Sequence, residues 1–240
     1  CSISRILKVN TMTEIISHFK GIFVTEPLQL QQRLSHVKAY VFDWDGVFND
    51  GMKDEHGSSP FSEVDSMGTN LLRYNFYQQH KNIPVVAIIS GEQNKAANAL
   101  ATRERFHSVY GGIKFKVEAL NHICSTYDIH PSEVAFVFDD VLDLSIAEKC
   151  GVRIMVPRAC NPLLVEFAVQ NNMVDYLTAC DGSKGAVREA TELISGLSGI
   201  YQETLHNRMN FTESYREYLS TRQQCITRFY TSREGKITEL

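Results

Sequence analysis

The feature that most constrains the fold of this 240-residue chain is a series of short apolar runs separated by helix-like segments. The apolar runs occupy residues 37–42, 85–89, 134–138, 152–156 and, more weakly, 175–178. The helix-like segments lie at roughly 66–80, 94–105, 116–127, 141–149 and 184–196. Short, nearly continuous apolar runs are typical of strands buried on both faces. Strands joined through helices form a mainly parallel sheet, so the sequence predicts a Rossmann-like α/β fold with helices on both faces.

Patterning outside these runs predicts three parts. Residues 1–36 form an N-terminal extension with a short helix at 27–34, where Pro27 occupies the first turn. Residues 37–196 form the α/β domain. Residues 197–240 are polar and aromatic, and their aromatic side chains recur at roughly helical spacing. We expect this tail to be a helical extension packed on its own core or on a partner chain.

Composition excludes several classes of function. The net charge of −4 offers no positive field for nucleic acid or an anionic membrane. No apolar run approaches the ~20 residues that span a bilayer. Six cysteines without a CxxC pair are too sparse for a disulfide scaffold, which favours a reducing compartment. We therefore expect a cytoplasmic protein that binds neither nucleic acid nor membrane.

Carboxylates follow two of the predicted strands directly. Asp43 and Asp45 come after the first strand, and Asp139, Asp140 and Asp143 come after the run at 134–138. Each group alone could be a turn or a helix cap, because Asp favours both. Ligands of parallel sheets bind outside the carboxyl ends of the strands, so the two groups together predict a site there. Hard oxygen ligands of this kind suit Mg²⁺.

Two further segments fit phosphate binding at the same edge. Ser90 and Gly91 follow the run at 85–89 and offer a hydroxyl and backbone amides to an anion. Lys116 begins a helix after a Gly-Gly turn and could reach the same anion. Taken alone, Ser90 is more often a turn residue, and Lys116 is more often a solvated lysine.

The order Asp43-x-Asp45, Ser90, Lys116, Asp139-Asp140-x-x-Asp143 resembles the four signature motifs of the haloacid dehalogenase (HAD) superfamily. The segments 45–51 and 182–189 resemble its capless subgroup, the 3-deoxy-D-manno-octulosonate (KDO) 8-phosphate and nonulosonate 9-phosphate phosphatases. The similarity covers about residues 36–196.

The resemblance implies a role for each motif residue. Asp43 would be the nucleophile that forms an aspartyl-phosphate, and Asp45 the general acid and base. Asp43, the Asp45 carbonyl and Asp139 would hold Mg²⁺, supported by Asp140 and Asp143. Ser90, Gly91 and Lys116 would bind the phosphoryl oxygens. The partner implied is a small-molecule phosphate ester, such as a sugar or sugar-acid phosphate.

The spacing leaves no room for a cap domain. Forty-four residues separate Asp45 from Ser90, and 22 separate Lys116 from Asp139. We expect the first gap to hold a β-hairpin at 47–61, turning near 54–57, and one helix. In the resembled subgroup four subunits assemble through these hairpins, and a neighbour's C-terminal segment covers the site. The resemblance therefore implies a homotetramer, with Lys184 and Arg188 near the subunit's own or a neighbour's site, although either could be a surface charge.

Three positions depart from the resembled subgroup. Val64 and Glu92 stand where cations are usual, and Phe138 stands where Gly precedes the paired aspartates. Losing two cations should weaken binding of an acidic sugar. The sequence predicts a Mg²⁺-dependent phosphomonoesterase. A phosphotransferase or mutase, and a scaffold or regulatory protein of the same fold with little turnover, remain as alternatives.

Overall fold

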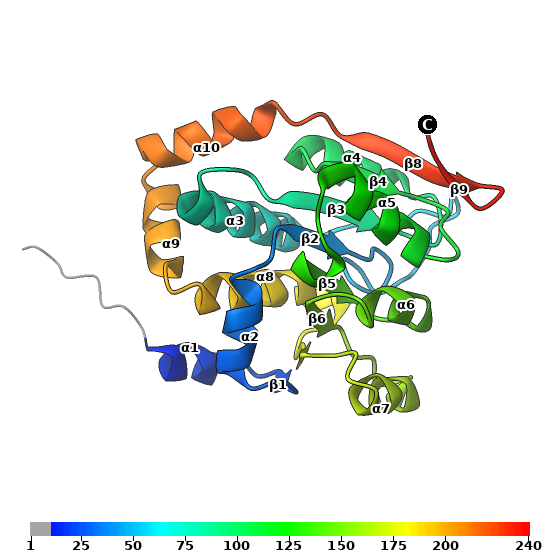
Figure 1. Ribbon diagram of the computed structural model, residues 1–240, viewed down its shortest axis with the longest axis horizontal. Helices are drawn as coiled ribbons and strands as arrows, with labels where there is room; N and C mark the ends of the chain where they lie inside the picture. The colour runs from blue at the N-terminus through cyan, green and yellow to red at the C-terminus, as the bar shows by residue number, and fades with distance from the viewer. Residues whose placement is uncertain (1–10) are drawn as a thin grey trace, which may run out of the picture.

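The computed structural model describes residues 11–240 and consists of one nine-stranded sheet with helices on both faces (Figure 1). The strand order is β1-β7-β6-β5-β2-β3-β4-β8-β9. All neighbours are parallel except the outermost pairs, β1–β7 and β8–β9. This architecture confirms the predicted Rossmann-like α/β fold. The first ten residues of the predicted N-terminal extension lie outside the described part.

The strands are β1 (Ile22–Phe23), β2 (Ala39–Phe42), β3 (Val85–Ile89), β4 (Ser108–Tyr110), β5 (Val134–Phe138), β6 (Val152–Met155), β7 (Tyr176–Leu177), β8 (Arg228–Arg233) and β9 (Lys236–Glu239). The α-helices are α1 (Met12–His18), α2 (Pro27–Leu34), α3 (Glu63–His80), α4 (Lys95–Glu104), α5 (Val117–Tyr127), α6 (Leu144–Ala147), α7 (Pro162–Gln170), α8 (Ala186–Leu197), α9 (Tyr201–Met209) and α10 (Glu213–Gln223). The 3₁₀ turns are η1 (Pro131–Glu133), η2 (Val141–Asp143) and η3 (Gly182–Lys184). None of the helices in the described part is long and apolar enough to cross a bilayer.

The central strand β2 shows why both faces of the sheet are covered. Its four residues are all buried, and alternate side chains enter two different cores. Tyr40 and Phe42 pack with apolar residues of α3, α4 and α8. Ala39 and Val41 pack with those of α5, α6 and α7. The carboxyl ends of β2, β3 and β5 therefore meet at one edge between two helical layers.

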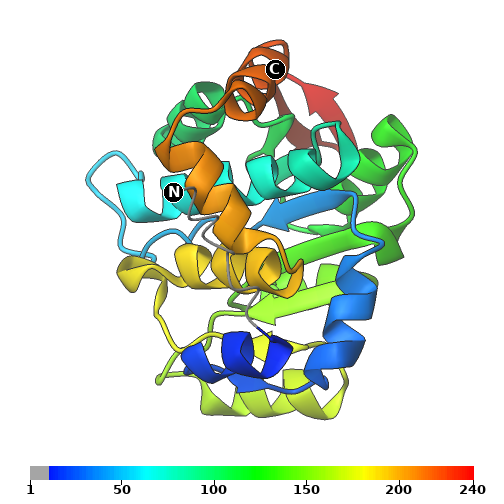
Figure 2. The same cartoon turned by 90° about the vertical axis from the view of Figure 1, so that its left-hand side faces the viewer.

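The C-terminal tail is helical only in its first part. Helices α9 and α10 pack against α3, with α9 crossing it steeply (Figures 1 and 2), and Tyr215 and Tyr218 of α10 bury against Tyr74 and Tyr77. Residues 228–239 are not helical as predicted; they form a hairpin whose strand β8 pairs with β4. Glu234 and Gly235 both have positive φ, as a tight two-residue hairpin turn requires. The three-part division of the chain stays a prediction.

The segment 47–61 contains the predicted turn but no strands. The Asp54 carboxylate accepts the N–H groups of His56 and Ser58, and Gly57 N–H donates to the Asp54 carbonyl. Val47 and Phe48 are drawn into the core, where Phe48 stacks on Trp44. Without these apolar residues the rest of the segment is mostly polar, and an isolated two-stranded ribbon is marginally stable. The expected β-hairpin is therefore a turn-containing loop in this chain.

Candidate active site

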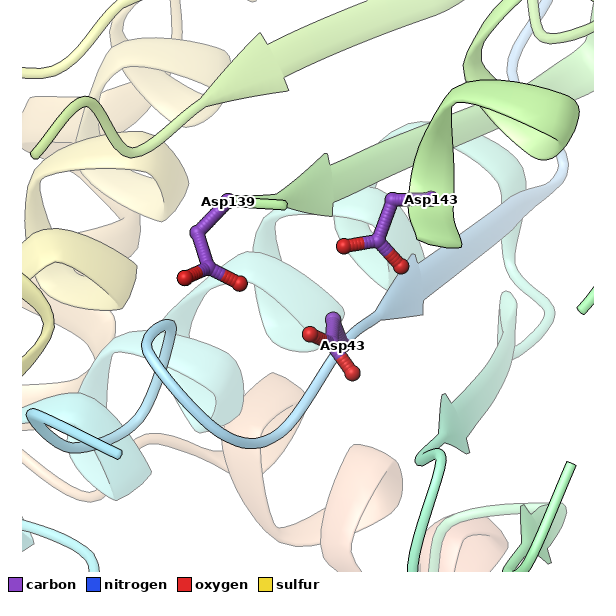
Figure 3. Close-up of side chains that lie close together, drawn as sticks. All are labelled: Asp43, Asp139 and Asp143. Carbon is purple, nitrogen blue, oxygen red and sulfur yellow. The ribbon is translucent and has the colours of Figure 1, made fainter. Parts of the chain in front are cut away.

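Three carboxylates converge at the edge where β2 and β5 end (Figure 3). Asp43 directly follows β2, Asp139 directly follows β5, and Asp143 lies at the end of the short turn η2. One oxygen from each carboxylate lies within 4.8 Å of those of the other two, and all three residues are buried. The parallel pairing of β2 with β5 places the two strand ends side by side. The sequence predicted this convergence from the strand ends alone.

Lys116 offsets part of this negative charge. Its Nζ donates to Asp43 Oδ1 and to Asp143 Oδ1, both at 2.6 Å, and the side chain is 3% exposed. Burial acts to lower the pKa of Lys116, but the two carboxylates outweigh it and the pKa rises. The lysine therefore stays charged and ties the loop before α5 to the strand ends.

Despite Lys116, the charged forms of Asp139 and Asp143 remain unfavourable in the cluster. Burial raises the pKa of Asp139, and the neighbouring Asp43 and Asp143 raise it further. Burial and Asp43 likewise raise the pKa of Asp143, against the opposing effect of Lys116. Such shifts mark a place where additional positive charge is favourable.

Arg158 is a second cation at the cluster, and sequence reasoning missed it. Its Nε donates to Asp139 Oδ2 at 2.7 Å, and its Nη1 donates to the Asp50 carbonyl at 3.2 Å. A Cβ at Gly46, which has φ +88°, would meet Arg158 Nη2 at 1.9 Å and Asp139 Oδ2 at 2.0 Å. Arg158 follows β6, which neighbours β5, so its position just beyond a parallel strand was the available signal.

The donor set fits a divalent cation. Asp139 Oδ1 is buried and has no hydrogen-bond partner in the structure, although its other oxygen binds Arg158. A buried carboxylate oxygen without a partner is costly, and a metal ion would satisfy it. Carboxylate oxygens are the ligands that Mg²⁺ prefers. Three carboxylates against two cationic side chains leave room for additional positive charge.

Asp45 lies beside the cluster with partners of its own. Its Oδ1 accepts a hydrogen bond from Ser59 at 2.6 Å, and its Oδ2 lies 2.5 Å from Lys53 Nζ. Both partners come from the 47–61 loop, which therefore orients the Asp45 carboxylate. Lys53 and Ser59 were not singled out from the sequence, because nothing in their spacing marks them.

Ser90 and Gly91 lie at the same sheet edge, at the end of β3, the strand that pairs with β2. Ser90 follows β3, which is parallel to β2, and it is 1% exposed. Its Oγ accepts the Glu92 N–H at 3.4 Å, and its carbonyl accepts the Ile113 N–H. These bonds fix the loop that leads toward Lys116.

Three other predicted residues do not place a side chain in the carboxylate cluster. The Asp140 carboxylate caps η2 by accepting the Val141 N–H at 2.7 Å, while the Asp140 N–H donates to Asp143 Oδ2 at 3.2 Å. Arg188 pairs with Glu192 at 3.0 Å and donates to the Tyr201 hydroxyl. Lys184 is exposed and pairs with Asp181. Within one chain, neither cation contacts the cluster.

The three departures from the resembled subgroup have clear positions. Val64 is 55% exposed at the start of α3. Glu92 pairs with Lys114 on the surface. Phe138 is fully buried and stacks on Phe136, with ring centroids 5.3 Å apart. Phe138 therefore packs within the core and leaves the position of Asp139 intact.

Comparison with known proteins finds sequence relatives among the KDO 8-phosphate phosphatases. No protein-family model matches the chain. It is 28% identical over 167 residues to the KDO 8-phosphate phosphatase of Yersinia pestis, covering 68% of this chain and 82% of that enzyme. The KDO 8-phosphate phosphatase of Salmonella typhi is 29% identical over 175 residues, with 71% of this chain and 86% of that enzyme covered.

Solved structures show the same fold. A Legionella pneumophila protein assigned to the HAD superfamily (subfamily III A) superposes with a TM-score of 0.63 at 26% identity, covering 76% of this chain and 95% of that one. The Moraxella catarrhalis KDO 8-phosphate phosphatase, in complex with magnesium, phosphate and KDO, superposes with a TM-score of 0.62 at 25% identity. The match covers 75% of this chain and 98% of that enzyme. With its carboxylates and Lys116 in the predicted order, the chain is a HAD-fold protein that resembles the KDO 8-phosphate phosphatases in sequence and structure.

Proposed function

We propose that this protein is a Mg²⁺-dependent phosphomonoesterase that acts on a small sugar phosphate through an aspartyl-phosphate on Asp43. The observation that carries the proposal is the buried trio of Asp43, Asp139 and Asp143 with Lys116 donating to two of them. Buried carboxylates around one lysine are costly to maintain for stability alone. Their cost is understandable if the cluster binds a cation and a phosphate group.

Asp43 is the proposed nucleophile. Its carboxylate attacks phosphorus, the bond from phosphorus to the ester oxygen breaks, and the phosphoryl group is transferred to the aspartate. Lys116 lies 2.6 Å from Asp43 Oδ1, so its ammonium is placed to offset charge on the transferring phosphoryl oxygens. Asp43, Asp139 and the Asp45 backbone carbonyl would hold Mg²⁺, which supplies the charge neutralisation that lets a phosphate approach a carboxylate.

Asp45 is the proposed general acid and base. Its carboxylate would protonate the departing alkoxide and then take a proton from the water that hydrolyses the aspartyl-phosphate. The contacts with Ser59 and Lys53 support this role, because they orient the carboxylate without burying it fully. A base placed for water favours hydrolysis over transfer of the phosphoryl group to another sugar.

Sugar phosphates are the proposed substrates because the named relatives act on a phosphorylated sugar acid. Val64 and Glu92 provide no positive charge where the resembled subgroup has cations. We therefore propose a neutral sugar phosphate rather than an acidic one. We also propose that the protein is cytoplasmic. We propose in addition that it is a homotetramer, since the chain has no cap domain and the resembled subgroup covers its sites with neighbouring subunits.

The test is phosphate release from a panel of phosphate esters, with and without Mg²⁺. Neutral sugar phosphates should be hydrolysed in the presence of Mg²⁺, faster than KDO 8-phosphate, and EDTA should abolish the reaction. Transfer of phosphate to an added sugar without release would favour a phosphotransferase. No turnover of any ester, p-nitrophenyl phosphate included, would contradict the proposal.

A further inference from the structure

A second candidate site, a cavity lined by charged and apolar side chains, lies away from the carboxylate cluster, between the core and the C-terminal helices. It has a volume of about 290 Å³ and is lined by residues of α3, α4, α9 and α10 and the turn between the last two. Figure 2 shows α9 crossing α3, with α10 above them. None of the residues proposed for catalysis lines this cavity.

Positive charge exceeds negative charge in the lining. Arg103, Arg208 and Arg222 contribute guanidinium groups, whereas Glu63 and Glu104 contribute the carboxylates. Arg103 pairs with Glu63, and Arg222 Nη1 pairs with Glu104 Oε2 at 2.8 Å. The Arg208 guanidinium is not paired with a carboxylate in the described chain; it lies over the Tyr215 ring at 4.7 Å. One positive charge is therefore left without a counter-ion.

Two guanidinium nitrogens of this lining also lack acceptors. The Nε atoms of Arg208 and Arg222 are buried and have no hydrogen-bond partner in the structure, and Arg222 as a whole is 9% exposed. A buried N–H without an acceptor is destabilising, and more so on a charged group. Both the unpaired charge and the unpaired donors call for an anion that offers several acceptor oxygens.

We propose that this cavity binds the phosphate group of free phosphate or of a small phosphorylated metabolite. Guanidinium groups are the side chains best matched to phosphate, because their planar donors reach two oxygens at once. Arg103 comes from the core helix α4, Arg208 from α9 and Arg222 from α10. A phosphate bound by Arg208, beside the carboxylate-paired Arg103 and Arg222, would fasten the C-terminal helices to the core, at a site separate from the one proposed for catalysis.

Calorimetric titration with inorganic phosphate and with glucose 6-phosphate, both in EDTA, tests the proposal. In EDTA the catalytic carboxylates repel phosphate, so binding there reports the second cavity. The variant Arg208→Gln should bind at least about ten-fold more weakly than the native chain. Arg233→Gln, an exposed arginine at the end of β8 that does not line the cavity, is the matched control and should bind as the native chain does.

The outcomes are distinct from those of the activity test. Tighter binding of glucose 6-phosphate than of phosphate would identify a metabolite site, and the reverse would identify a site for free phosphate. Asp43→Asn should retain this binding, which separates it from the catalytic cluster. Circular dichroism of Arg208→Gln confirms that the variant is folded. No binding at millimolar phosphate, or equal binding by Arg208→Gln, would overturn the proposal.

Discussion

At the scale of single residues, Asp43 carries the largest predicted effect. Asp43→Asn should abolish phosphate release from p-nitrophenyl phosphate, because an amide is not a nucleophile for phosphorus and binds Mg²⁺ poorly. Asp128→Asn is the control, since Asp128 is an exposed C-cap at the far end of α5 from Lys116 and Asn tolerates its left-handed backbone. Turnover of more than a few per cent in Asp43→Asn would refute the assignment.

A substitution at Asp45 should affect turnover without affecting Mg²⁺ binding. Asp45→Asn removes the proposed acid and base but keeps the backbone carbonyl proposed to bind Mg²⁺. We expect turnover to be lost while calorimetry still shows Mg²⁺ binding. If the variant no longer binds Mg²⁺, the division between side chain and carbonyl is wrong.

Arg158 should stabilise the folded chain through its ion pair with Asp139, one of the carboxylates proposed to bind Mg²⁺. In Arg158→Gln the buried Asp139 loses its charged partner, and the free energy of unfolding in EDTA should fall by about 1–3 kcal/mol. Added Mg²⁺ should raise the melting temperature of this variant more than that of the native chain. Arg228→Gln breaks an exposed pair with Glu239 and should change stability by less than about 1 kcal/mol. Equal effects of the two substitutions would contradict this account.

The cluster was predictable where residue type and strand position coincide, and not elsewhere. Asp43, Asp139 and Lys116 stand directly beyond predicted strands or at the start of a predicted helix. Arg158, Lys53 and Ser59 contact the site carboxylates from loops, and only the folded path of those loops brings them there. Asp140 was predicted to support the cluster, and it bonds Asp143 through its backbone N–H, while its side chain caps η2.

At the scale of elements, Asp65 joins two helices beside the site. It lies in the first turn of α3, and its Oδ1 accepts the Arg188 N–H at 2.8 Å, in the first turn of α8. Helix α8 has Gly185 at its N-cap and no side-chain cap of its own. Asp65 therefore provides the missing cap from another element.

This link should make stability depend on pH. Burial raises the pKa of Asp65 from 3.8 to about 6, against the lowering effect of the Arg188 N–H. The folded state therefore binds the proton more tightly than the unfolded state. The stability contributed by protonation is complete below pH 3.8 and is lost as the pH rises through about 6.

Asp65→Asn should remove that dependence, because an amide cannot ionise and still accepts the Arg188 N–H. Denaturant unfolding should show the variant gaining up to about 2–3 kcal/mol over the native chain between pH 4 and pH 7. Asp181→Asn, an exposed position before α8, should show no such gain. A parallel pH profile for Asp65→Asn and the native chain would rule out this role.

The long strands could be predicted because burial on both faces of the sheet leaves a continuous apolar run in the sequence. Most of the helices were then predicted as the segments between these runs. Strand β4 has three residues and β7 has two, which is too short for periodicity to identify with certainty. The 228–239 hairpin was missed because the helical spacing of the apolar and aromatic residues between Tyr201 and Leu219 was extended to the end of the chain. The Glu234-Gly235 turn between alternating residues was the contrary signal.

At the scale of the whole molecule, the tail is tied to its own core. Tyr215 and Tyr218 bury against α3, and β8 extends the central sheet. The aromatic residues of the tail are thus partly accounted for within one chain, and the case for assembly rests on the uncapped site. Closed symmetric oligomers are the usual way for identical chains to cover such a surface.

We expect light scattering at micromolar concentration to give a homotetramer. Each chain has a mass of 27.2 kDa, so the tetramer is readily distinguished from a monomer or dimer. A fully active monomer would contradict the assembly and its proposed covering role. An inactive monomer would contradict only the assembly under those conditions.

The central claim, that Asp43 carries the phosphoryl group during turnover, is tested most directly by trapping the intermediate. The Mg²⁺-loaded enzyme would be mixed with a sugar phosphate that it hydrolyses, quenched in acid within milliseconds and digested for mass spectrometry. We predict a single phosphorylated aspartate, Asp43, enriched in the Asp45→Asn variant because hydrolysis is slowed, and absent from Asp43→Asn. Turnover without a phosphorylated peptide in either the native chain or Asp45→Asn, or phosphate on another residue, would contradict the account.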